Sequence, residues 1–255
     1  IEEIIEISKR VNHPFPIFVD TTFKMSWVYV TSFTFRHPLI TGDPICPFAF
    51  VLTERKYRRD YEGFVREMLA IYSGLKNASV YFISDKEFDI GNRVWGETRT
   101  IHCWLHVLKD IKMPSMKMIN EPEERDSLIR WWLEARESLS AKLLDSKWEL
   151  YLLDHPLPDK AKNYMDKVIE QWKETSALWV LNATRGYVGT EGATSNPAES
   201  FNRLIKSFED KEVPVDQLAA VLRYYSQFAV NELNRWRRNH ANRGYKPEYQ
   251  HLATS

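Results

Sequence analysis

The carboxylates of three acidic residues could bind a metal ion. Asp20 follows the apolar run Ile17 to Val19, and Asp85 follows a second apolar run over residues 80–83. Both runs are too short for a helix and indicate strands. If these strands are neighbours in one sheet, both carboxylates emerge at the same edge and offer the oxygen ligands that Mg²⁺ prefers. An Asp directly after a strand is also a common turn residue, and this alternative stays open.

Glu199 is the third acid, near the start of a predicted helix. A structural interpretation competes here, because Asn196 suits the N-cap and Pro197 the first helical position, so that Glu199 could close a capping box. An ion pair with Arg203, four residues on, is a second structural use. Glu199, Arg203 and Lys206 share one helix face, along which a metal-bound acid followed by cations could hold phosphates. An ordinary solvated face is the alternative.

The elements that position these acids are mostly strands before Asp85 and helices after it. Strands are expected at 17–19, 27–35, 48–52, 80–83 and 98–102, and helices at 61–75, 103–111, 121–145, 160–181, 197–209 and 214–240. Glu87 and Asp89 are expected to be solvated helix residues. On the helix of Glu199, the apolar spacing predicts a buried stripe of Phe201, Leu204, Ile205 and Phe208.

Composition limits the classes of protein to which the chain can belong. The 255 residues allow one large domain or a domain with a sizeable insertion, and 44% hydrophobic residues indicate a packed core. Lys+Arg and Asp+Glu are equal at 35 each, so any contact with nucleic acid must rest on local patches. The two cysteines are too few for a disulfide framework and fit a reducing compartment. No stretch has the roughly 18–20 apolar residues of a membrane span.

Three stretches together resemble the catalytic domain of Mutator-like (MULE) transposases, in the DDE, RNase H-like transposase group. They are Val19 to Phe23 with the strands up to Val51, Ile83 to Glu87 continuing through residues 98–106, and Ser195 to Arg203. The resemblance covers about residues 16–210 and depends on the order and spacing of the stretches.

This resemblance implies an α/β fold, with an RNase H-like mixed five-stranded sheet flanked by helices and interrupted by an all-α insertion. The core would comprise residues 1–113 and 191–255, and the insertion residues 114–190. Asp20, Asp85 and Glu199 match the family's catalytic acids. They would hold two Mg²⁺ ions, roughly 3.5–4 Å apart, for which Mn²⁺ can substitute.

The activity so implied is cleavage of DNA strands at transposon ends, followed by strand transfer into target DNA. The implied partners are terminal-repeat DNA and target DNA. The protein would act on them as a homodimer, in the nucleus and without a membrane partner. One alternative is a domesticated transposase that regulates transcription by binding DNA without cutting it. Two further alternatives are another RNase H-like nuclease and a helical interaction module in which the three acids serve only as helix caps and turn residues.

Cys103 and His106 match the family's Cys-x-x-His motif. Two ligands cannot complete a tetrahedral zinc site, and Cys46 and His102 are possible additional ligands. The alternative that we favour is a buried pair that braces the metal site by packing or by hydrogen bonds.

Aromatic and basic residues offer two candidate DNA contacts. In related transposases an insertion-domain Trp can stack on a base flipped out of DNA, and Trp131 and Trp132 are candidates here. Since we expect that adjacent residues cannot both face one core, one of the two should point outward; burial of each in the helical core is the competing interpretation. Arg237 and Arg238 lie in a basic stretch that could hold DNA phosphates, or could be a solvated helix end.

Overall fold

The computed structural model describes residues 1–11, 15–22, 27–85, 94, 100–136, 142–173, 196–207, 213–238 and 243–253. The predicted helix residues Glu87 and Asp89 lie outside these ranges. The chain divides into two compact units. The first unit comprises Ile1–Thr100 and Ser195–Ser255, and the second comprises Ile101–Thr194. The first boundary therefore precedes the position predicted from the sequence, at residues 113 and 114.

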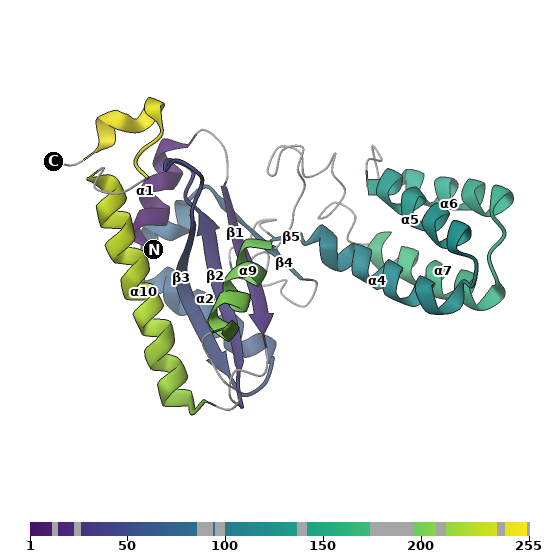
Figure 1. Ribbon diagram of the computed structural model, residues 1–255, viewed down its shortest axis with the longest axis horizontal. Helices are drawn as coiled ribbons and strands as arrows, with labels where there is room; N and C mark the ends of the chain where they lie inside the picture. Colours follow the sequence, from purple (N-terminus) through teal and green to yellow (C-terminus); the bar gives the residue numbers. More distant parts are fainter. Residues whose placement is uncertain are drawn as a thin grey trace. The chain divides into compact units, whose positions relative to one another are not determined.

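A mixed sheet of five strands has the order β3-β2-β1-β4-β5 (Figure 1). The strands are β1 (Phe15–Thr22), β2 (Tyr29–Arg36), β3 (Ile45–Thr53), β4 (Val80–Ser84) and β5 (Thr100–His102). β2 is antiparallel to both β1 and β3, whereas β4 is parallel to β1. This order and these directions are consistent with an RNase H-like fold. The predicted α/β class with a mixed five-stranded sheet is confirmed.

Helices cover both faces of the sheet in the first unit. Among the described residues these are α1 (Glu2–Arg10), α2 (Arg58–Ile71), α9 (Asn196–Ser207) and α10 (Val215–Arg237), with short 3₁₀ helices at Ser73–Asn77 and Pro247–Leu252. Side chains alternate between the faces of a strand. Val19, Phe33 and Phe82 pack with α1 and α2 on one face. Val30 packs with α9 and α10 on the other, which we call the α9 face.

The second unit is helical in its described residues after β5. Its helices are α4 (Trp104–Met118), α5 (Pro122–Arg136), α6 (Lys142–Asp154) and α7 (Asp159–Lys173). The single helix predicted over residues 121–145 is wrong, since α5 ends at Arg136 and α6 begins at Lys142. In the described parts of both units, no helix is long and apolar enough to cross a membrane.

Trp131 and Trp132 both lie in the core of the second unit. Their exposed fractions are 8% and 0%, and Trp131 also packs against Trp148 with ring centroids 5.1 Å apart. The expectation that one of the pair points outward is wrong. Helix α5 contacts both α4 and α6, so a wide arc of its surface is buried. Adjacent residues project from a helix about 100° apart, and both can therefore lie within that buried arc. Both indoles are therefore engaged in core packing, and base stacking by either one remains a prediction.

Helix α1, which the sequence analysis did not predict, is tied to the end of α10 by Glu3. One oxygen of this carboxylate lies 2.8 Å from Nε2 of the fully buried His37. The other oxygen pairs with the guanidinium of Arg237. Arg237 therefore has a structural role in the first unit, whereas its neighbour Arg238 is exposed.

Arg237→Ala is expected to lower the free energy of unfolding by about 1–3 kcal/mol, because it leaves the largely buried Glu3 carboxylate without its charged partner. Urea unfolding followed by circular dichroism measures this change. Arg238→Ala, one residue along the same helix end, serves as the matched control and should leave stability within about 0.5 kcal/mol of the wild type. Equal stability of the two variants would contradict the structural role of Arg237.

Candidate metal centre

Asp20 lies on β1, with its side chain on the α9 face of the sheet. Its neighbour Thr21 points to the opposite face, where its hydroxyl lies 2.9 Å from that of Thr31. On the α9 face, the Asn202 amide Nδ2 donates to Asp20 Oδ2 at 2.7 Å. Ser32, which pairs with Asp20 across the antiparallel ladder, donates to its main-chain oxygen at 3.5 Å. Asp20 is thus held from a neighbouring strand and from a helix.

Asp85 follows β4, the strand beside β1, so the condition that the two strands be neighbours is met. Phe18 pairs with Ile83 in this parallel ladder. Two residues further along each chain are Asp20, which is still within β1, and Asp85, which directly follows the last residue of β4. Because side chains alternate along a strand, Asp20 belongs to the α9 face, and Asp85 would share that face if the alternation continued one residue beyond Ser84. The hydroxyl of Ser84 donates to the main-chain oxygen of Asp85 at 3.1 Å and orders the chain at this point.

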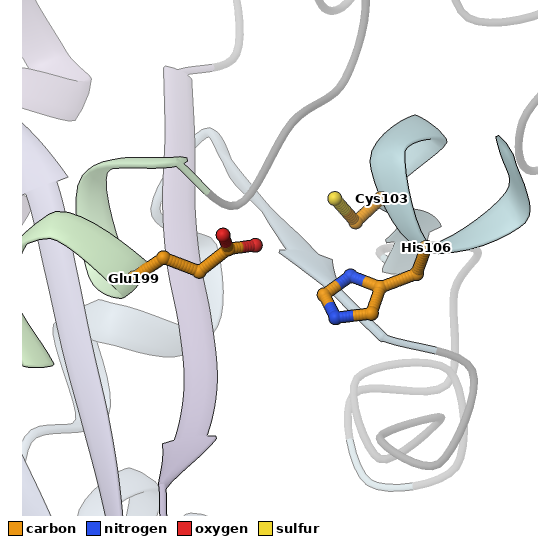
Figure 2. A group of neighbouring side chains, drawn as sticks. All are labelled: Cys103, His106 and Glu199. Atoms are coloured by element: carbon orange, nitrogen blue, oxygen red, sulfur yellow. The ribbon is translucent and has the colours of Figure 1, made fainter. Parts of the chain in front are cut away.

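Glu199 lies in the first turn of α9 and is partly exposed. Helix α9 packs on β1 and β2, and Asn202, one turn after Glu199, is the residue that reaches Asp20. Residues three apart lie on the same side of a helix. Figure 2 shows the Glu199 carboxylate extending away from α9. The side chain of Asn196 lies outside the described residues, so the capping-box alternative stays open.

The buried face of α9 differs from the predicted stripe. Ala198, Phe201, Asn202 and Ile205 are buried, whereas Leu204 is 44% exposed. The prediction that Leu204 is buried is wrong, and Phe208 lies outside the described residues. Asn202 is the site residue that the sequence analysis missed. A polar residue within an apolar stripe was the only available signal, since its partner Asp20 is 182 positions away in the chain.

The donor set of the three acids suits a hard divalent ion. All the candidate ligand atoms of Asp20, Asp85 and Glu199 are carboxylate oxygens, as Mg²⁺ and Mn²⁺ prefer, and soft metals would select sulfur or nitrogen. Within the part of the chain that the structure describes, these acids do not bring three oxygens within 4.8 Å of one another. Ionised carboxylates repel at short range, and a cation between them removes that repulsion.

Cys103 and His106 lie at the start of α4. Cys103 is fully buried, and its main-chain carbonyl accepts the N–H groups of His106 and Val107 at 3.1 and 3.2 Å, which begins the helix. Figure 2 shows the thiol and the imidazole projecting to the same side of this first turn. The pair could contribute a sulfur and a nitrogen ligand, which are two of the four that tetrahedral zinc requires. A bracing role for the pair remains a prediction.

Cys46, one of the two suggested additional zinc ligands, has the character of a core residue. It lies buried on β3, and its thiol donates to the carbonyl of Pro44 at 3.6 Å. Burial raises the pKa of the Cys46 thiol to about 12, which disfavours the thiolate that binds zinc. His102, the other candidate, is buried on β5.

Two of the predicted DNA-contacting cations lie on the helix of the third acid. Arg203 and Lys206 are exposed on α9, four and seven residues after Glu199. They lie one and two turns along the helix from Glu199, and a path for phosphates over them remains a prediction. Among the four cations proposed for DNA, only Arg237 has a described ion pair, with Glu3.

No family model matches the sequence, and no curated protein matches it either. The fold is α/β with an RNase H-compatible strand order, and the three acids belong to β1, to the end of β4 and to α9.

Proposed function

We propose that this chain is the catalytic domain of a DDE transposase of the Mutator-like group. It cleaves DNA strands at transposon ends and transfers them to target DNA. The observation that supports the proposal is the parallel pairing of β1 with β4: Asp20 lies on β1, Asp85 directly follows β4, and the helix of Glu199 packs on β1. The helical unit between Asp85 and Glu199 in the sequence supports it further, since the family has an insertion there.

Asp20, Asp85 and Glu199 would hold the Mg²⁺ or Mn²⁺ ions. When bound, two such ions activate a water or a DNA 3′-hydroxyl and stabilise the leaving oxygen. Asp20 offers a carboxylate whose orientation Asn202 fixes, and Glu199 offers one from the first turn of α9. The exposed Arg203 and Lys206 on the same helix would bind DNA phosphates beside these acids.

DNA cleavage by the purified chain is expected to require Mg²⁺ or Mn²⁺ and to stop when EDTA removes the ion, because all three proposed ligands are carboxylates that act only through the metal. Conversion of supercoiled plasmid to nicked and linear forms measures this activity. Cleavage that persists in EDTA would contradict the proposal. DNA binding without cleavage in either ion would favour the domesticated regulator instead. A dimeric complex with DNA and a nuclear location remain predictions from the resemblance.

A further inference from the structure

Asn202 is a buried polar residue in the middle of an apolar helix face. It is 3% exposed, and its neighbours on that face are Ala198, Phe201 and Ile205. Its Nδ2 lies 2.7 Å from Oδ2 and 3.4 Å from the main-chain oxygen of Asp20. Burying an amide is costly unless it forms such hydrogen bonds, and an apolar residue of similar volume would fill the space without that cost. Packing alone therefore does not explain an Asn at this position.

We propose that Asn202 is a positioning residue for the metal site, an inference that rests on the proposed function. Its N–H group holds one oxygen of the Asp20 carboxylate and fixes the plane of that carboxylate. The same hydrogen bond thereby also sets the direction of the second carboxylate oxygen of Asp20, Oδ1. Residues that orient a metal ligand in this way tune affinity without touching the ion.

The same amide also sets the position of Glu199. Both residues lie on α9, three positions apart, so the bond from Asn202 to β1 limits how the helix can shift or rotate over Asp20. Glu199 moves with the helix, because a helix turn is rigid. One side chain therefore links the first and third acids, and a metal site needs its ligands held to within about 0.5 Å.

The other end of the Asn202 side chain gives an independent reason to connect it with a hydrated ion. Its Oδ1 is buried and accepts no hydrogen bond from the described residues. A buried acceptor without a donor is destabilising. Since Oδ1 belongs to the amide that contacts the Asp20 carboxylate, a water carried by Mg²⁺, which usually keeps several, would supply a donor there.

The test is Mn²⁺ binding to the whole chain, measured by electron paramagnetic resonance and by calorimetry, which is independent of activity. Asn202→Leu keeps the number and branching of the side-chain heavy atoms and suits the apolar face, and Asn202→Ala removes the amide with a smaller side chain. Both are expected to weaken Mn²⁺ binding by about 10- to 100-fold. Leu204→Ala, on the exposed side of the same helix, is the matched control and should bind Mn²⁺ as the wild type does.

Thermal unfolding in EDTA separates positioning from folding. Asn202→Leu is expected to unfold at a temperature close to that of the wild type, while its Mn²⁺ affinity falls. A folded Asn202→Leu variant with wild-type Mn²⁺ affinity would overturn the inference. Asp20→Asn distinguishes the two proposals. If Asp20→Asn loses Mn²⁺ while Asn202→Leu retains it, only the role of Asn202 is wrong; if Asp20→Asn binds Mn²⁺ normally, the proposed function fails as well.

Discussion

Glu199→Gln and Asp20→Asn are each expected to slow Mg²⁺-dependent DNA cleavage by about a thousandfold or more. Each change keeps the shape of the side chain and removes one charged oxygen ligand. A metal ion contributes several kcal/mol of transition-state stabilisation, and about 4 kcal/mol corresponds to a thousandfold in rate. Because Glu199 is partly exposed and Asp20 lies at the edge of the buried core, neither variant should unfold the first unit.

Initial rates of plasmid nicking, at matched protein concentration and with Mg²⁺ or Mn²⁺, measure this effect. Glu67→Gln is the control, since Glu67 is an exposed acid on α2, which packs on the opposite face of the sheet. It should cleave at the wild-type rate. Circular dichroism and thermal unfolding establish that all the variants are folded. Cleavage by Glu199→Gln or Asp20→Asn at the rate of Glu67→Gln would remove the acids from the mechanism.

Trp132→Ala is expected to lower the free energy of unfolding of the second unit by about 3–5 kcal/mol. The Trp132 side chain is fully buried, among Trp131, Trp148 and Leu128. Removing an indole from such a core loses its transfer free energy and leaves a cavity that rigid neighbours fill only in part. Since a domain is stable by only about 5–15 kcal/mol, this change alone could unfold the unit at moderate temperature.

Guanidinium unfolding, followed by tryptophan fluorescence and by circular dichroism, measures this loss of stability. Leu153→Ala provides the contrast, because Leu153 on α6 is 79% exposed and its truncation should change stability by less than about 0.5 kcal/mol. A Trp132→Ala variant as stable as Leu153→Ala would show that the indole is not part of a packed core.

Most of the sheet follows from local sequence patterns. The apolar runs that precede Asp20 and Asp85 predicted β1 and β4, because short runs rich in β-branched and aromatic residues favour buried strands. Helix boundaries in the second unit were harder to predict. Nothing between Arg136 and Lys142 is a Gly or Pro, so no local breaker marks the end of α5, and the packing of α5 on α4 and α6 is a tertiary effect.

The site was predicted less completely than the fold, for a physical reason. Apolar periodicity predicts that Leu204 is buried and Asn202 is not. In the structure Asn202 is buried and Leu204 is exposed, because the hydrogen bond to Asp20 stabilises Asn202 at the buried position. That bond joins residues 182 positions apart in the chain, a separation that no local pattern spans. Trp131 illustrates the same limit, because a helix with neighbours on several sides buries residues that a one-sided helix would expose.

The most direct test of the central claim is a crystal structure of the chain with Mn²⁺, in which anomalous scattering locates the ions. We predict two ions bound by carboxylate oxygens of Asp20, Asp85 and Glu199, with Asn202 still hydrogen-bonded to Asp20. Ions bound elsewhere, with these three acids making no contact to metal at saturating Mn²⁺, would contradict the account.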